Sequence, residues 1–416
     1  MPFDFTTLPN GVRVVGERID HFRSVSVGLW VGTGSQYEKP DEGGLSHFIE
    51  HMVFKGTGRR TARQIAAEMD AVGGQLNAFT AKECTCFYAK VMDEHLPLAM
   101  DVLTDMVVDP AYDPVELEKE KGVVIEEIAM AEDTPEDLVH ERLMVAHYGD
   151  QPLSRPILGL EEDIRAYTSD HLRAYWSRRY RPQDIVLAAA GHYDWDSVVG
   201  MAQDMLGKLS REGFEERACA TRAVRPGATG CDKDIEQMHI CLGYPSIDMF
   251  DERNYELSLF SSVFGGAMSS RLFQKIREER GAAYTVYTYP NGYTDTGMFS
   301  VYAATNPETA REVIDMILDE ARLIAEQGMT REEFVMAREQ LKASFVLGLE
   351  STSARMQSLG RRMLLQDTTR SHEEILARLQ ALKIDDCNAL GRDMLTKPHS
   401  LSLVGEGAEA MAREYR

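Results

Sequence analysis

Two histidines and a glutamate stand close together near the start of the 416-residue chain. His47, Glu50 and His51 have the spacing i, i+3, i+4, which makes them neighbours on one helix face, with Cβ atoms about 5 to 6 Å apart. Two imidazoles so placed can bind one zinc ion, and Glu50 then stands beside it. The other face of this predicted helix, over residues 45–54, is apolar and would pack on the core: Leu45, Phe48, Ile49, Met52 and Val53.

A third ligand has to come from elsewhere, because a catalytic zinc ion usually takes three protein ligands and keeps a position for water. The pair Asp113-Pro114 predicts the start of a helix. On it, Glu120 and Glu127 share a face because they lie seven residues apart. Eleven acidic residues lie from Asp113 to Glu141. Spacing does not choose the ligand among them, and a solvated surface acid is the alternative for each.

The predicted elements occur twice along the chain. Pro182 and Pro398, each between a helix and an apolar strand, are 216 residues apart, and Leu45 and Leu257, each in a short helix, are 212 apart. Similar offsets of this size indicate duplicated units of roughly 210 residues. We expect a first unit over 1–213, a linker over 214–231 and a second unit over 232–416.

The two predicted units differ at the histidine motif. At an offset of 212, the second unit has Leu259, Phe260, Ser261, Ser262 and Val263 where the first has residues 47–51. Serine is the one polar side chain left there. We therefore expect one metal site per chain, in the first unit.

Runs of strands mixed with runs of helices indicate the fold class. Strands are predicted at 12–15, 24–31, 185–190 and 238–242, and a hairpin at 75–91. Helices and strands do not alternate strictly, which favours an α+β fold. We expect each unit to be a mostly antiparallel sheet with helices packed on it.

Charge and composition exclude several classes of protein. The net charge is −22, and residues 101–150 hold fifteen carboxylates against three basic side chains, so nucleic acid is excluded as a main partner. The acidic segment is either a solvated helix face or a field that attracts basic ligands. No apolar run approaches the ~20 residues that a membrane span needs. The six cysteines lack a framework spacing and the first residues lack a signal-peptide pattern, so we expect a cytoplasmic protein.

Several segments together resemble a known family. The segment GGLSHFIEHMVFKGT resembles the inverted zinc motif of the pitrilysin (insulinase) family of metallopeptidases, and VVIEEI, which contains Glu127, resembles its third-ligand segment. The similarity covers essentially the whole chain, including NAFTAKECTCFYAKV and SSRLFQKIREERGAAYTVYTY. It is strongest to the short, two-unit branch with the catalytic subunit of the mitochondrial processing peptidase and its bacterial relatives.

The resemblance implies a zinc metalloendopeptidase that cleaves unfolded peptides or precursor segments inside a closed chamber. In such an enzyme His47, His51 and Glu127 would be the Zn²⁺ ligands. Glu50 would be the general base, and Glu120 would orient a ligand.

The same resemblance implies the substrate contacts. Asn77, Ala78 and Phe79 would lie on an edge strand that binds a peptide by strand addition. From the second unit, Arg277 and Tyr284 would stabilise the oxyanion of the transition state. We expect Asp137 and Glu141, one turn apart in the acidic segment, to hold an arginine or lysine of the substrate.

The number of units predicts a partner chain. Long members of the family have four units in one chain, and the first faces the fourth. A two-unit chain would then form a homodimer, or a heterodimer with a related non-catalytic chain, in which Arg277 and Tyr284 act in trans. Two alternatives remain: a non-catalytic structural or assembly subunit of the same fold, and a metal-dependent hydrolase of substrates other than peptides.

Overall fold

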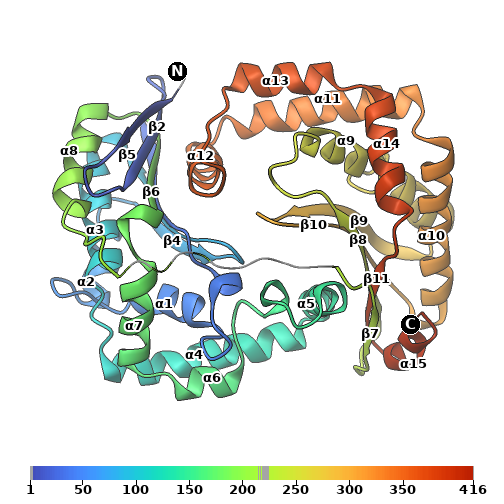
Figure 1. The fold of residues 1–416 in the computed structure, drawn as a ribbon, viewed down its shortest axis with the longest axis horizontal. Helices are drawn as coiled ribbons and strands as arrows, with labels where there is room; N and C mark the ends of the chain where they lie inside the picture. The colour runs from blue at the N-terminus through green and yellow to red at the C-terminus, as the bar shows by residue number, and fades with distance from the viewer. Residues whose placement is uncertain (1–2, 214, 216, 218–223, 416) are drawn as a thin grey trace. The chain divides into compact units, whose positions relative to one another are not determined.

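A computed structural model of the chain describes residues 3–213, 215, 217 and 224–415, which form two compact units (Figure 1). Among these residues, unit 1 comprises 3–128, 155–217 and 347–371. Unit 2 comprises 129–154, 224–346 and 372–415. Each unit therefore contains a segment from the opposite half of the chain.

Unit 1 is built on a six-stranded sheet with the strand order β1-β2-β6-β3-β5-β4. Its strands are β1 (Asp4–Thr7), β2 (Arg13–Arg18), β3 (Ser24–Val31), β4 (Gln75–Thr80), β5 (Thr85–Met92) and β6 (Ile185–Gly191). All neighbouring pairs are antiparallel except β2 with β6. Strand β4 lies at the edge of this sheet.

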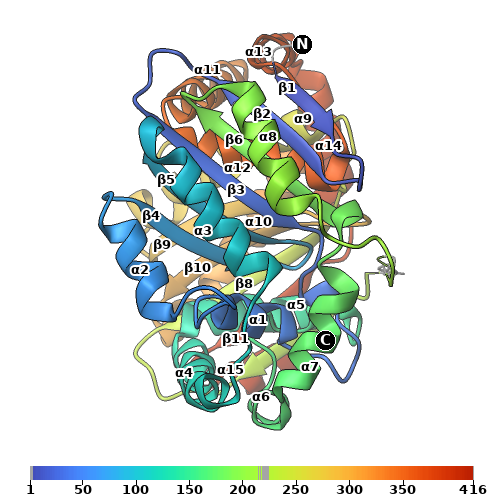
Figure 2. The ribbon, with the colours of Figure 1, turned by 90° about the vertical axis from the view of Figure 1, so that its left-hand side faces the viewer.

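Helices cover both faces of the unit 1 sheet. The helices of unit 1 are α1 (Leu45–Val53), α2 (Ala62–Asp70), α3 (Leu96–Val108), most of α4 (Pro114–Asp133), α6 (Glu161–Ala166), α7 (Ser169–Arg179), α8 (Trp195–Leu206) and α12 (Thr352–Gln366). Figure 2 shows α3 and α8 in front of the strands, and α12 lies on the opposite face. The side chains of strand β3 point alternately to the two faces of the sheet. Val25, Val27 and Leu29 belong to the hydrophobic core of the unit, whereas Gly28 faces α12. A Cβ at Gly28 would lie 2.4 Å from Met356 Sδ, so a larger residue there would require the Met356 side chain on α12 to move.

Unit 2 repeats this plan on a five-stranded sheet with the order β7-β11-β8-β10-β9. Its strands are β7 (Ala228–Cys231), β8 (Met238–Ser246), β9 (Ala283–Gly292), β10 (Gly297–Thr305) and β11 (Ser400–Val404). Its helices are α5 (Pro135–Tyr148), α9 (Asn254–Phe264), a π-helix (Phe273–Glu279), α10 (Ala310–Gln327), most of α11 (Arg331–Gly348), α13 (His372–Ala381), α14 (Ile384–Leu395) and α15 (Ala408–Arg413). Only β7 and β11 pair in parallel.

The two halves of the chain exchange one helix each. Helix α5 comes from the first half but packs on β8 and β11 of unit 2, whereas α12 comes from the second half and packs on β3 and β6 of unit 1. The chain passes from α4 to α5 at Thr134-Pro135, where the proline lacks an N–H and disfavours helical backbone in the residue before it. Asp137 and Glu141 therefore lie on a separate helix and not on a continuation of the Glu127 helix.

The predicted α+β class is confirmed, with one parallel pair in each otherwise antiparallel sheet. The proposed sequence repeat and its borders at 213 and 232 remain a prediction. The predicted linker falls partly on residues outside the described ones, and its last four residues, Ala228–Cys231, form β7. In the part of the chain that the structure describes, no helix is long and apolar enough to cross a membrane.

Candidate active site

Helix α1 separates its packing face from its polar face as the spacing predicts. Leu45, Phe48, Ile49, Met52 and Val53 are buried in the core of unit 1. The remaining stripe contains the two histidines and the glutamate of the motif. Burial of the apolar stripe therefore fixes the direction in which the polar stripe points.

The start of α1 is held by a buried carboxylate that the sequence did not single out. Glu38 accepts hydrogen bonds from the backbone N–H groups of Gly44, at 2.9 Å, and Ser46, at 2.7 Å. Gly44 has φ 81°, and a Cβ there would lie 2.5 Å from the carbonyl oxygen of Leu158. A glycine is required at this turn, and Glu38 satisfies N–H groups that the helix leaves unpaired.

Three potential metal ligands meet between α1 and α4. The side-chain donor atoms of His47, His51 and Glu127 all lie within 4.8 Å of one another. Glu127 Oε2 lies 3.7 Å from His47 Nε2 and 3.3 Å from His51 Nε2. Ligands on a tetrahedral zinc ion, with bonds of about 2.0 to 2.2 Å, lie roughly 3.4 Å apart. Two imidazoles and a carboxylate at these separations fit a zinc ion.

The neighbouring glutamates set the roles of the ring nitrogens. His51 Nδ1 lies 2.9 Å from Glu120 Oε1, so Nδ1 carries a proton, and Nε2 is the nitrogen that faces Glu127. Glu120 is buried, and its other oxygen lies 2.6 Å from Lys55 Nζ. Glu126, beside Glu127 on α4, is exposed and is not in the group.

Protonation of the two histidines is affected in opposite directions. Burial, helped by the nearby His51, lowers the pKa of His47 to about 3, so its ring is neutral. Burial alone would lower the pKa of His51, but the hydrogen bond to Glu120 and the charges of Glu127, Glu120 and Glu50 outweigh it and raise that pKa. The carboxylates thus favour a positive charge at this point, which a proton or a metal ion can supply.

Glu50 stands beside the three ligands and is held by a strand. Burial raises the pKa of Glu50, and the Thr80 hydroxyl donates a hydrogen bond of 2.6 Å to Glu50 Oε2. Thr80 is the last residue of β4. A partly buried carboxylate with a raised pKa and a fixed orientation is suited to accept and release a proton. Sequence reasoning missed Thr80, although it directly follows the predicted substrate residues.

Asn77, Ala78 and Phe79 lie on β4, which pairs with β5 alone in the described sheet. The N–H of Ala78 donates to Asn77 Oδ1 at 2.8 Å, and the ring of Phe79 lies edge-on to Trp30 at 5.6 Å. The edge strand ends at the residue that holds Glu50. A peptide added to this edge would therefore lie alongside the strand that orients Glu50.

The remaining predicted residues belong to unit 2. The Arg277 guanidinium lies 4.7 Å from the ring centre of Phe273 and 4.8 Å from that of Tyr284, so Arg277 and Tyr284 are in contact. Tyr284 is 74% exposed. Asp137 is exposed and Glu141 half-buried on α5. Their predicted actions at the metal centre remain predictions.

Comparison with known proteins identifies the family. Residues 13–161 match the family described as insulinase (peptidase family M16), and residues 166–341 match the peptidase M16 inactive domain. The chain is 41% identical over 402 residues to the uncharacterized zinc protease YmxG of Bacillus subtilis, covering 96% of this chain and 97% of that protein. It is 40% identical to an uncharacterized zinc protease of Streptomyces coelicolor, with 96% and 89% covered.

Solved structures show the same fold. A peptidase M16 inactive domain from Pseudomonas fluorescens has a TM-score of 0.91 at 18% identity, with 98% of each chain covered. A protease from Helicobacter pylori has a TM-score of 0.90 at 20% identity, with 97% of this chain and 99% of that chain covered. The sequence matches, which extend over nearly the whole chain, confirm the predicted family: this protein belongs to peptidase family M16, the insulinase or pitrilysin family.

Proposed function

We propose that this chain is a zinc-dependent endopeptidase. The observation that carries the proposal is the convergence of His47, His51 and Glu127, with His51 oriented by Glu120. The names of its relatives as zinc proteases support the choice of metal. Zinc bound by these three residues would supply a Lewis acid that activates water and polarises a peptide carbonyl.

The protein's own groups would move the proton. Glu50 would accept a proton from the attacking water and transfer it to the leaving amine, because it is the remaining carboxylate of the motif and is not a ligand. Thr80 would keep Glu50 in one orientation through its hydrogen bond. Arg277 and Tyr284 would stabilise the negative charge that develops on the substrate carbonyl oxygen.

The edge strand β4 favours an extended peptide as substrate. Strand addition uses main-chain hydrogen bonds, so it accepts many sequences but requires an unfolded segment. A closed chamber, formed with a second copy or a related non-catalytic chain, would exclude folded proteins. This arrangement fits cleavage within unfolded peptides or precursor segments.

Acidic residues of α5 would give a preference for basic substrates. His140 lies on the same helix, next to Glu141, and burial, the main cause, lowers its pKa, which disfavours a positive charge on its ring. We expect the double variant Asp137→Asn/Glu141→Gln to cleave Arg-containing peptides less efficiently. An unchanged rate that is also insensitive to salt would leave these residues as a solvated face.

Metal analysis and cleavage mapping together test the proposed function. Mass spectrometry of the purified protein should find one zinc per chain, and incubation with a random peptide library should give internal cleavage products. Ester substrates in the same assay test the hydrolase alternative, for which we expect no turnover. Zinc-loaded protein that cleaves no peptide, either alone or together with a related non-catalytic chain, would contradict the proposal.

A non-catalytic assembly subunit is the second candidate, because residues 166–341 match a domain named as inactive. The intact motif on α1 argues against this role for the whole chain. The two candidates differ in peptide cleavage: a non-catalytic subunit would cleave no peptide either alone or with its partner chain, whereas the endopeptidase would cleave peptides and lose that activity in Glu50→Gln.

A further inference from the structure

Lys55 lies outside the histidine motif but contacts Glu120, the carboxylate that contacts His51. Its Nζ lies 2.6 Å from Glu120 Oε2, and Glu120 Oε1 lies 2.9 Å from His51 Nδ1. Each oxygen of this carboxylate therefore has one partner, on opposite sides. Glu120 is 4% exposed, so water does not replace either partner readily.

The ion pair has two geometric consequences. A carboxylate rotates about the bond to its last methylene, and partners on both oxygens stop that rotation, which fixes the direction in which Glu120 accepts from His51. The pair also joins the end of α1 to α4. Because Glu127 lies two turns further along α4, the same contact sets the separation of the histidines from Glu127.

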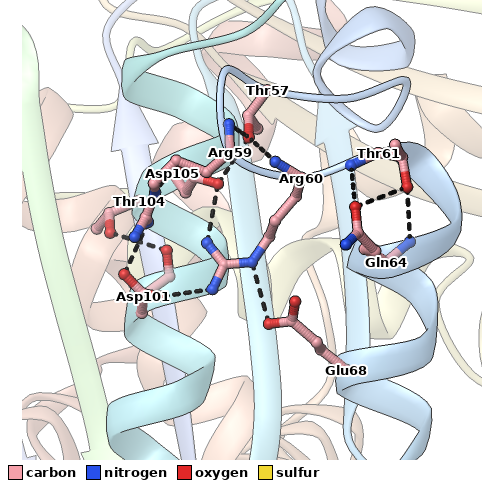
Figure 3. A network of polar contacts seen from close by, with 9 residues as sticks. All are labelled: Thr57, Arg59, Arg60, Thr61, Gln64, Glu68, Asp101, Thr104 and Asp105. Carbon is pink, nitrogen blue, oxygen red and sulfur yellow. Dashed lines mark hydrogen bonds and ion pairs between the residues drawn. The ribbon is translucent and has the colours of Figure 1, made fainter.

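The loop that contains Lys55 is itself anchored. Figure 3 shows that Thr57 donates to Asp105 of α3 and that Arg59 and Arg60 contact both Asp101 and Asp105 of that helix. Arg60 also contacts Glu68 of α2. The Arg59 Nε and Arg60 Nη1 atoms lie 2.8 Å and 2.9 Å from the two oxygens of Asp105. Asp105 is 7% exposed. These contacts hold the loop against the core of unit 1 and thereby fix the backbone position of Lys55.

We propose that Lys55 is a positioning residue for the metal centre, which acts through Glu120 to align His51 and to hold α4 against α1. The proposal rests on the proposed zinc site. The positioning role of Lys55 and the charge of its ammonium group predict opposite effects on zinc binding when Lys55 is replaced. The ammonium group repels a zinc ion, so removing its charge alone would tighten zinc binding, whereas losing the alignment weakens it.

Zinc affinity of the full-length protein is the decisive measurement, made by titrating it against a chelating indicator. Lys55→Gln and Lys55→Met should each bind zinc about tenfold more weakly than the wild type, in the range expected when an outer partner of a ligand is lost. Lys55→Arg should retain most of the affinity. The matched control is Lys119→Met, which removes an exposed lysine of α4 that pairs with Glu116 and should bind zinc as the wild type does.

The route through Glu120 is tested by a double variant. Adding Lys55→Gln to Glu120→Gln should weaken zinc binding no further than Glu120→Gln alone. An equal further loss in that background would overturn the proposal, as would unchanged or tighter binding in the single variants. Affinities are compared in whichever neutral Lys55 variant keeps the melting temperature of the zinc-free wild type.

Failure of this inference is distinct from failure of the proposed function. If Glu127→Gln binds zinc as tightly as the wild type, the proposed zinc site is wrong. If Glu127→Gln loses zinc but the Lys55 variants do not, the zinc site stands and the role of Lys55 is wrong. The visible spectrum of the cobalt-substituted protein gives a second readout, which should change in Lys55→Gln and not in Lys119→Met.

Discussion

We predict that Glu50 is needed for catalysis but not for zinc binding, whereas the histidines beside it bind the metal. Glu50 is proposed to act on water, and its carboxylate is held by Thr80 and is not in the ligand group. Glu50→Gln should therefore abolish peptide cleavage and leave zinc bound. Activity on a quenched fluorescent peptide and zinc content by mass spectrometry, measured on the same preparation, check this. An active Glu50→Gln protein would show that another group is the base.

The choice of the third ligand is tested by two adjacent glutamates. Glu127 lies within 3.3 Å of His51 Nε2, whereas Glu126 is exposed. We expect Glu127→Gln to lose zinc on dialysis, as His47→Ala and His51→Ala should, and Glu126→Gln to keep it. Zinc retained by Glu127→Gln and lost by Glu126→Gln would place the ligand one residue earlier.

The hydroxyl of Thr80 is predicted to matter for turnover and not for binding. A hydrogen bond to a charged group contributes about 1.5 to 3 kcal/mol, so losing it in Thr80→Val should lower kcat by roughly 10- to 100-fold. Thr80→Ser keeps the donor and should retain most of kcat. KM and zinc content should not change. A Thr80→Val enzyme with wild-type kcat would mean that Glu50 keeps its orientation without this bond.

At the scale of elements, local patterns predict α1 and the β4–β5 hairpin well. The apolar period of residues 45–53 and the turn at residues 81–84 depend on neighbours in the chain, so the sequence contains the full signal. The exchange of α5 and α12 has no such signal, because nothing in the local sequence of either helix specifies which sheet it covers. Only packing decides which sheet each helix covers.

The residues of the candidate site also divide into those that local spacing predicts and those that it does not. His47, Glu50 and His51 follow from spacing within one helix, and the family resemblance supplied Glu127 from eleven acidic residues. Thr80 is 30 residues from Glu50, and Lys55 is 65 residues from Glu120. Such contacts join different elements, so periodicity does not reveal them.

His147, a buried histidine of α5 that contacts β11, is predicted to make the stability of the protein depend on pH. His147 is fully buried, its Nδ1 lies 2.9 Å from Ser400 Oγ, and burial lowers its pKa to about 4. An unfolded histidine has a pKa of about 6.5, so between these values the unfolded chain binds more protons. The contribution of His147 to the free energy of unfolding should therefore fall by about 3 kcal/mol as the pH drops from 6.5 to 4.

Calorimetric unfolding at pH 7 and pH 4.5 checks this prediction. His147→Gln should lose less stability than the wild type over this interval, because glutamine does not titrate. His21→Gln, which removes an exposed histidine, should lose as much as the wild type. An equal loss in all three proteins would mean that His147 is not kept neutral by the fold.

At the scale of the whole molecule, the chain has one candidate metal centre among its described residues, in unit 1, and one candidate oxyanion pair, in unit 2. Arg277 and Tyr284 contact each other, and Tyr284 is largely exposed, so the pair is open to a substrate or to another chain. In the four-unit enzymes that the chain resembles, the zinc-bearing unit faces a different unit of the second half. We propose that a two-unit chain would reach the same composition by pairing with a second chain.

Mixing two inactive variants tests whether the site is completed between chains. Glu50→Gln chains keep Tyr284, and Tyr284→Phe chains keep Glu50. If Tyr284 acts in trans, one site of each mixed dimer combines Glu50 of one chain with Tyr284 of the other, and activity should rise from near zero to about half of the wild-type value per mixed dimer, since one of its two sites works. Subunit exchange is followed with differently labelled chains. Exchange without recovered activity would show that each chain uses its own Tyr284, or that this side chain only supports Arg277 through the contact between them.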